Sequence, residues 1–289
     1  MPMPMPMPTI GRRSLYLPIA GHELHVSEWG DPQAPAVVLW HGLARVGRDF
    51  DTAAAHLAAR YRVICPDTIG RGLSTWSAEP EADYTLATYV THAVGLLDAL
   101  GVATCAWVGT SMGGLVGMLA AAGPLAGRIA RLVLNDIGPL LNPAAVARIK
   151  AYVGPVLSFA TMTEFIAFLR AVYAPYGIQT EAEWQRMAET SVRRRDDGRL
   201  SPHYDPAVMS VFAAAETAPL WMEWDRVACP ALVLRGAESD LLLPETAEEM
   251  TRRGPRAQLV TVPGCGHAPA LNTPAQLAVL ESFLAGEPI

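Results

Sequence analysis

The chain has 289 residues, of which 51% are hydrophobic and 17% are charged, and its formal net charge at pH 7 is −6. This composition is typical of a compact globular protein and excludes a disordered or fibrous one. The negative balance argues against a nucleic-acid partner, because phosphate binding needs clustered lysine and arginine. The sequence contains no uninterrupted apolar run of about 18 residues, so we expect neither a transmembrane helix nor a membrane partner.

The first eight residues are Met-Pro repeated four times. Proline at every second position blocks helix and sheet alike, which predicts a disordered, extended tail over residues 1–10. The tail has no basic region ahead of an apolar one, so we do not expect a signal peptide. The four cysteines are far apart and form no Cys-x-x-Cys pair. We therefore expect free, reduced thiols and a cytoplasmic protein.

After the tail, short β-branched apolar runs alternate with longer segments rich in alanine and leucine. This alternation predicts an α/β fold, with a mostly parallel sheet flanked by helices. The first two predicted strands form a hairpin around Gly21. The predicted strands are Ser14–Ile19, Glu23–Trp29, Ala36–Trp40, Arg62–Cys65, Cys105–Val108, Arg131–Asn135, Ala231–Arg235 and Gln258–Val262. The predicted helices are Phe50–Ala59, Thr85–Leu100, Gly114–Ala122, Pro244–Arg253 and Pro274–Leu284.

The alternation stops after Asn135 and resumes only at Ala231. The segment between contains helical patterns but no convincing strand, so we predict a helical insertion over residues 139–219 in a core formed by residues 11–138 and 220–289. A basic run, Arg193–Arg195, is followed by two aspartates and is interpreted as a solvated loop. The predicted helices of the insertion are Ala144–Tyr152, Met162–Val172, Glu181–Ser191 and Pro206–Glu216.

The strongest local motif is Gly109-x-Ser111-x-Gly113, placed between a predicted strand and a predicted helix. This is the context of a nucleophile elbow, in which a strained turn exposes the serine at a helix N-terminus. Side chains at positions 109 and 113 would collide with neighbouring backbone. A dinucleotide-binding fold is the less favoured alternative, because Ser111 stands where its second glycine should be.

A nucleophilic serine needs a base, and His267 lies in a glycine-rich loop between the last strand and the last helix. The other histidines lie in the hairpin, on helices, in the insertion or in the loop around His41. The base in turn needs an acid. We favour Asp240, in the loop after the Ala231–Arg235 strand, which gives the chain order serine, aspartate, histidine.

Asp136 is the main competitor for the acid, because it too lies just past a strand end, and Glu238 is a third possibility. The residues around Asp136 resemble an exit into the insertion, which is why Asp240 is preferred. An oxyanion hole requires two backbone amides. We predict those of Met112, directly after the serine, and Leu43, in the loop after the third strand.

The neighbours of Leu43 in that loop allow two further predictions. His41 is expected to pin the loop by hydrogen bonds. Arg45 either contacts a polar group of the substrate or forms a salt bridge within the loop. The insertion is rich in aromatic residues, and its candidate substrate contacts are Phe159, Phe168 and Tyr173, although each of them could instead pack the insertion against the core.

Five motifs occur in a fixed order along nearly the whole chain after the tail, and together they resemble the α/β-hydrolase superfamily. They are His41-Gly42, Asp67-x-x-Gly70-x-Gly72-x-Ser74, Gly109-x-Ser111-x-Gly113, Gly236-x-x-x-Asp240 and Gly266-His267. The resemblance implies an eight-stranded sheet, a helical cap formed by the insertion, and a pocket between cap and core. It assigns no chemistry to the loop from Asp67 to Ser74.

Departures from subfamilies of this superfamily narrow the expected reaction. Its haloalkane dehalogenases and epoxide hydrolases carry aspartate where this chain has Ser111. Its C–C bond hydrolases usually have a Gly-Pro-Gly type loop after His-Gly, and its proline iminopeptidases have tryptophan in place of Met112. We therefore expect a serine esterase that cleaves small to medium, mainly apolar carboxylic esters through an acyl-enzyme, with no metal or organic cofactor. Thioesters, lactones and C–C bonds are alternative substrates, and a non-catalytic ligand receptor is the alternative function.

Overall fold

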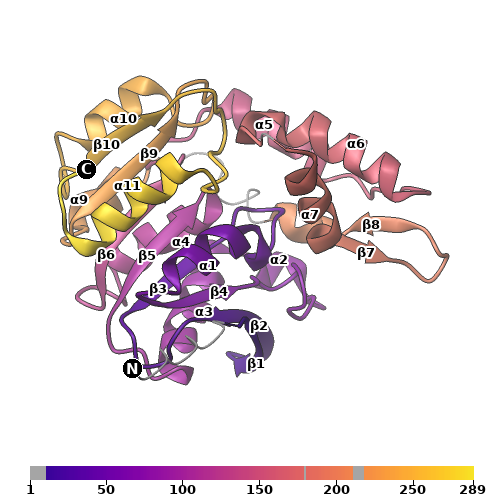
Figure 1. Ribbon diagram of the computed structural model, residues 1–289, viewed down its shortest axis with the longest axis horizontal. Coiled ribbons are helices and arrows are strands. Elements are labelled where there is room, and N and C mark those ends of the chain that lie inside the picture. Colours follow the sequence, from indigo (N-terminus) through magenta and orange to yellow (C-terminus); the bar gives the residue numbers. More distant parts are fainter. Residues whose placement is uncertain (1–10, 179, 211–217) are drawn as a thin grey trace, which may run out of the picture.

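The computed structural model describes residues 11–178, 180–210 and 218–289 (Figure 1). The predicted tail, residues 1–10, lies outside these ranges. None of the helices within them is long and apolar enough to cross a membrane. All four cysteines are free, as predicted.

The centre of the molecule is one eight-stranded sheet with the order β1-β2-β4-β3-β5-β6-β9-β10. β2 pairs antiparallel with β1 and with β4, and the remaining pairings are parallel. Every predicted strand is present, with ends shifted by no more than two residues. The strands are β1 (Arg13–Ile19), β2 (His22–Trp29), β3 (Ala36–Trp40), β4 (Arg62–Pro66), β5 (Cys105–Thr110), β6 (Ile129–Asn135), β9 (Ala231–Gly236) and β10 (Gln258–Val262).

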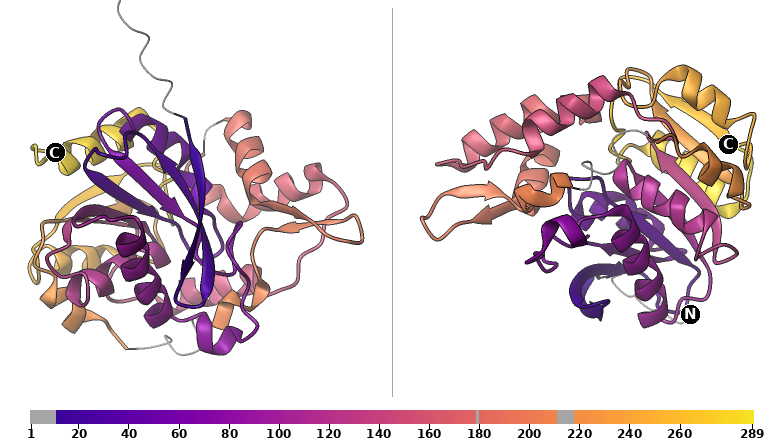
Figure 2. Two further views of the ribbon diagram at one scale, coloured as in Figure 1. Left: turned by 90° about the horizontal axis from the view of Figure 1, so that it is seen from below. Right: turned by 180° about the vertical axis from the view of Figure 1, so that it is seen from behind.

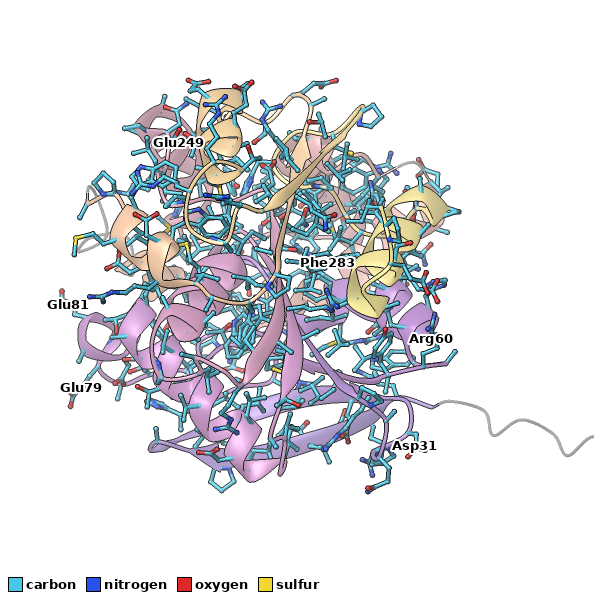
Figure 3. The ribbon with its side chains drawn as sticks, turned by 90° about the vertical axis from the view of Figure 1, so that its left-hand side faces the viewer. Asp31, Arg60, Glu79, Glu81, Glu249 and Phe283 are labelled. Carbon is cyan, nitrogen blue, oxygen red and sulfur yellow. The ribbon has the colours of Figure 1, made fainter. Side chains whose placement is uncertain are left out.

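Helices cover both faces of this sheet (Figure 2). One face packs against α1 (Asp51–Leu57) and α11 (Pro274–Ala285), where Phe283 is buried in the interior and labelled charged residues such as Arg60 lie at the periphery (Figure 3). The other face packs against α3 (Leu86–Ala99), α4 (Met112–Ala122), α9 (Trp221–Arg226) and α10 (Pro244–Met250).

The central strand β3 is apolar along its whole length because both of its faces are covered. Along β3 the side chains alternate between the two faces. Val37 and Leu39 pack on the side of α1 and α11, and Val38 and Trp40 pack on the side of α3 and α4. The short helices η1 (Gly47–Phe50), α2 (Pro80–Asp83) and α9 were not predicted. They have at most six residues each, too few to show a helical repeat in the sequence.

The segment between β6 and α9 extends to one side of the sheet (Figure 1). It contains α5 (Pro143–Val153), α6 (Met162–Tyr173), η2 (Ala174–Tyr176), α7 (Glu181–Ser191), β7 (Val192–Arg194), β8 (Leu200–Pro202) and η3 (Pro206–Ser210). We call residues 139–219 the insertion. Three of its four predicted helices are present. The fourth, Pro206–Glu216, begins as η3, and residues 211–217 lie outside the described ranges.

The hairpin of β7 and β8 corrects the expectation that the insertion has no strand and that Arg193–Arg195 is a solvated loop. Arg193 and Arg194 belong to β7, and Gly198 forms the turn with a φ of +79°. Each arm has only three residues, and β7 is largely charged, so no alternating apolar pattern marks it in the sequence.

The core contains a buried histidine that should make stability depend on pH. His92 on α3 is fully buried, and no described residue forms a hydrogen bond with its ring nitrogens. Burial lowers its pKa to about 4. In the unfolded chain it takes up a proton near pH 6.5, so stability is lost as the pH falls from 6.5 towards 4. This one group should lower the free energy of unfolding by about 2 kcal/mol between pH 8 and pH 5.

When the pH falls from 8 to 5, the free energy of unfolding of His92→Phe should therefore decrease by about 2 kcal/mol less than that of the wild type, because phenylalanine takes up no proton. Urea unfolding of both proteins at pH 8 and pH 5 measures this difference. An identical loss in the two proteins would contradict the prediction.

Candidate active site

Ser111 lies at a sharp turn between β5 and α4, with a φ of +52°. The positions two residues before and after Ser111 must be glycine, because a side chain at either one would collide with the backbone. A Cβ on Gly109 would lie 2.2 Å from the carbonyl oxygen of Gly113, and a Cβ on Gly113 would lie 2.1 Å from that of Trp40. The turn is therefore strained and closely packed, which is the geometry that the Gly-x-Ser-x-Gly motif predicts.

Ser111, His267 and Asp136 form a continuous line of hydrogen bonds. His267 Nε2 lies 2.9 Å from Ser111 Oγ, and His267 Nδ1 lies 2.8 Å from Asp136 Oδ2. Asp136 is fully buried, and its carboxylate also accepts hydrogen bonds from the Gly236 amide and the Ser239 hydroxyl. A carboxylate can only accept, so Nδ1–H donates to Asp136 and Nε2 is free to accept the proton of Ser111.

The prediction that Asp240 is the partner of His267 is wrong. The Asp240 carboxylate accepts two hydrogen bonds of 2.8 Å from Arg148 on α5, and its side chain is 46% exposed. Burial would raise the pKa of Asp240, but the hydrogen bonds with Arg148 outweigh it and lower that pKa. Asp240 therefore holds the insertion to the loop after β9.

Asp136 reaches His267 because of the order of strands in the sheet. β6 is the direct neighbour of β5, and Thr110 is paired with Asn135, so the residues that follow, Ser111 and Asp136, emerge side by side. The Ser111 amide donates to the Asn135 carbonyl. Asn135 Nδ2 donates to Thr110 Oγ1 and to the carbonyl of Pro269, which joins the serine turn to the histidine loop.

Sequence reasoning missed the supporting roles of Asn135 and Ser239. Asn135 was interpreted as part of the exit into the insertion. Ser239 directly precedes Asp240, so the favoured loop does serve the site, through its serine rather than its aspartate. For Asn135 the available signal was a polar residue at the end of an apolar strand, because such a residue needs hydrogen-bond partners when it is buried.

The two amides predicted for the oxyanion hole lie beside Ser111. Leu43 and Met112 line the same pocket as Ser111 and His267. Within the described ranges, neither amide has a backbone acceptor. The Met112 amide also belongs to the first turn of α4, where the helix dipole favours negative charge. Both amides are thus available to an incoming group.

His41 pins the loop that carries Leu43. Its Nε2 accepts a hydrogen bond from the Thr68 amide, so its Nδ1–H donates to the Gly42 carbonyl. Burial lowers the pKa of His41 to about 4, which keeps the imidazole neutral at physiological pH. His41 has no contact with Ser111 of the kind that a base needs.

The pocket over Ser111 is small and mainly apolar, with a volume of about 30 Å³. The insertion closes it with aliphatic side chains and three tyrosines, and Tyr173 is among them as predicted. Tyr152 and Tyr176 were not among the candidate contacts. The lining residues from the insertion are Leu141, Val146, Ile149, Tyr152, Val153, Tyr173 and Tyr176.

Phe159 and Phe168 do not line this pocket, and the structure shows them in the alternative role, packing within the insertion. Their rings lie 5.2 Å apart and pack around Phe165 in a small apolar cluster within the insertion. The insertion extends beyond the sheet and needs apolar packing of its own, which these two rings provide.

Arg45 lines both the Ser111 pocket and a second, more polar hollow of about 50 Å³. Its guanidinium forms two hydrogen bonds of 2.6 Å with Asp49, another with Ser191, and stacks on the Tyr173 ring. Of the two roles left open for Arg45, the structure contains the salt bridge. The hollow beyond it is lined by Glu183 and Arg186 of α7, among others.

A second serine–histidine–aspartate line occurs at the hairpin of β1 and β2. His25 Nε2 lies 3.2 Å from Ser14 Oγ, and His25 Nδ1 lies 2.7 Å from Asp67 Oδ2. Ser14 lies within β1, so it has neither a strained turn nor the free amides of a helix N-terminus beside it. Asp67 also accepts from the amides of Gly47 and Leu73, so its carboxylate organises loops.

Residues 37–280 match the model of the alpha/beta hydrolase family. The chain belongs to this family. Among the described residues of this α/β hydrolase, no group of three or more His, Cys, Asp or Glu side chains is placed to hold a metal ion.

Its relatives include a 3-hydroxybutyrate-oligomer hydrolase from Cupriavidus necator, which is 41% identical over 96% of this chain and 98% of the relative. A crystal structure of an alpha/beta hydrolase from Novosphingobium aromaticivorans is 34% identical, with a TM-score of 0.85 over 95% of this chain and 98% of that one. The structure of E-2-(acetamidomethylene)succinate hydrolase has a TM-score of 0.84 over 96% and 100% of the two chains. At 24% identity it shows the shared fold alone.

Proposed function

We propose that this α/β hydrolase is a serine esterase that cleaves short oligoesters of 3-hydroxybutyrate through an acyl-enzyme. The observation that carries the proposal is the hydrogen-bonded line from Ser111 through His267 to the buried Asp136. A serine activated by a base that an acid orients is the arrangement used for nucleophilic attack on a carbonyl.

In the proposed mechanism, Ser111 Oγ attacks the ester carbonyl while His267 Nε2 takes its proton. The amides of Leu43 and Met112 stabilise the oxyanion that forms. His267 then gives the proton to the leaving alcohol, and the acyl group stays on Ser111. A water molecule, deprotonated by His267, attacks this ester and releases the acid. Asp136 holds the imidazole in the required tautomer and stabilises its protonated form.

The lining of the Ser111 pocket supports a small, branched hydroxyacyl group. Aliphatic side chains such as Val146 and Ile149 suit the methyl group of 3-hydroxybutyrate. Burial raises the pKa of Tyr152 and Tyr173, so both hydroxyls stay protonated and can donate to a substrate hydroxyl. The Cupriavidus relative is described as acting on oligomers of this acid.

The free space over Ser111 is narrow, about 30 Å³. We expect the side chains that the insertion contributes to shift when an oligomer enters. The ion pair between Arg148 and Asp240 is one of the contacts that hold the insertion in place.

The proposal is tested with the linear dimer and trimer of 3-hydroxybutyrate, with the released monomer quantified by chromatography. The thioester and the lactone of the same acid serve as comparison substrates. We expect hydrolysis of the oligomers. We also expect inactivation by an aryl phosphonate, which transfers its phosphonyl group to Ser111 Oγ and releases the phenol, so that the protein gains the mass of the phosphonyl group. Binding of the oligomers with no turnover would support a receptor, and preference for the thioester or lactone would support those alternatives.

A further prediction concerns the second hollow, which we propose accepts the carboxylate end of the oligomer. Its acids already have partners, since Asp49 binds Arg45 and Glu183 binds Asn272 and Thr180. Arg186 has no ion-pair partner within the described part of the chain. Arg186→Gln should raise KM for the free-acid dimer about tenfold, which corresponds to about 1.4 kcal/mol, and leave KM for its methyl ester unchanged.

Steady-state kinetics with both forms of the dimer measure this difference. Arg48→Gln is the matched control, because Arg48 lines the same hollow but is already paired with Asp51. An equal change for the acid and the methyl ester would exclude the role of Arg186 in charge recognition.

A further inference from the structure

Arg71 is a fully buried cation in the loop after β4. Its guanidinium donates to the Leu43 carbonyl at 2.8 Å, the Ile69 carbonyl at 2.7 Å and the Tyr89 hydroxyl at 2.6 Å. It also stacks on the rings of Tyr84 and Tyr89. These partners are all uncharged. In the described ranges, no carboxylate lies within ion-pairing distance of Arg71.

An unpaired buried charge is costly, because the interior solvates it poorly. Two other arginines are buried. Arg45 is paired with Asp49, whereas Arg235 donates, among the described residues, only to backbone carbonyls in the loop after β9. Hydrogen bonds to carbonyl groups and contact with aromatic rings only partly replace a counter-ion for Arg71. Arg71 differs from Arg235 in its position, because it contacts Leu43 and Met112 beside Ser111, where a negative charge forms only during the reaction.

The contacts of Arg71 lead to the oxyanion hole. Its Nε binds the carbonyl of Leu43, and its Nη2 lies 3.6 Å from Met112 Sδ. Leu43 and Met112 line the Ser111 pocket, and their amides, which have no backbone acceptor within the described ranges, are the two proposed for the oxyanion hole. Arg71 is therefore in direct contact with both residues of the hole, although it does not itself line the pocket.

We propose that Arg71 is a positioning residue that supplies the counter-charge for the oxyanion formed when Ser111 attacks. This inference rests on the proposed serine mechanism. The hydrogen bond to the Leu43 carbonyl fixes the loop that carries one amide, and the fixed charge makes the potential at the hole more positive. The ester carbonyl is neutral before attack and negative after it, so the charge stabilises the transition state more than the bound substrate.

The test compares Arg71→Gln, which removes the charge but keeps a donor, with Arg71→Lys, which keeps the charge. We expect Arg71→Gln to lower kcat on the order of 10- to 100-fold with little change in KM. Arg71→Lys should lower kcat clearly less. Phenylboronic acid provides a second measurement, because it bonds to Ser111 Oγ as a tetrahedral anion while His267 accepts the serine proton. Its Ki should rise by the same factor as kcat falls.

The control is Tyr89→Phe, which removes one hydrogen bond from the guanidinium and leaves the charge in place. We expect nearly wild-type kcat and Ki. Thermal unfolding shows whether each variant is folded, and Arg71→Met repeats the neutral comparison if Arg71→Gln does not fold. Equal losses in Arg71→Gln and Arg71→Lys, an unchanged Ki, or a tenfold loss in Tyr89→Phe would each overturn the proposal. A wild-type protein that neither turns over ester nor reacts at Ser111 would instead refute the proposed function.

Discussion

Ser111→Ala is expected to lower kcat on 3-hydroxybutyrate oligomers by about 10³-fold or more, with a small effect on KM. Alanine has no nucleophilic oxygen, so no acyl-enzyme can form. The pocket and the two amides remain, and they should still bind the substrate. Single-turnover kinetics and mass spectrometry after exposure to the aryl phosphonate measure both losses, since the variant should show no added mass.

The chain offers a matched control for this experiment. Ser14 also has a hydroxyl next to a histidine that is bound to a buried aspartate. It lacks the strained turn and the adjacent free amides. Ser14→Ala should therefore retain wild-type activity and wild-type labelling. If Ser14→Ala were inactive and Ser111→Ala active, the wrong serine would have been assigned.

Asp136→Asn is expected to lower kcat about 10⁴-fold, the size of effect known for the corresponding change in serine proteases. The asparagine amide group can donate to His267 Nδ1, which favours the tautomer with the proton on Nε2. His267 can then no longer accept the serine proton. Asparagine has nearly the same shape as aspartate, so the folded structure should be kept.

Asp240→Asn is the comparison that separates the two candidate acids. Asp240 and Arg148 form a pair on a partly exposed surface, with side chains 46% and 39% exposed. Such pairs contribute at most about 1 kcal/mol, so we expect kcat within a few-fold of the wild type. Measuring kcat/KM for both variants decides the question, because a large loss in Asp240→Asn with an active Asp136→Asn would reverse the assignment.

The position of the acid shows how the sheet determines the site. Parallel strands place their carboxyl ends at one edge, so several acidic residues after strands are available to a single histidine. Asp136 follows the strand adjacent to the serine strand, while Asp240 follows the next one and pairs with the insertion. Ser239, which precedes Asp240, supports Asp136 instead.

The sequence by itself predicted every strand of the sheet, the serine turn, the histidine and two residues, Leu43 and Met112, that line the pocket beside them. These features depend on local patterns, namely buried β-branched runs, glycines that a tight turn requires, and the residue directly after the serine. Local patterns survive in the linear sequence because neighbours along the chain are also neighbours in space.

Only the tertiary structure decided between Asp136 and Asp240, placed Phe159 and Phe168 in the packing of the insertion, and paired Arg45 with Asp49. Each of these outcomes depends on which strands and loops lie side by side. The chain order of serine, aspartate and histidine is the same for either aspartate, so it contains no information about which carboxylate reaches the ring. That choice follows from the order of strands in the folded sheet.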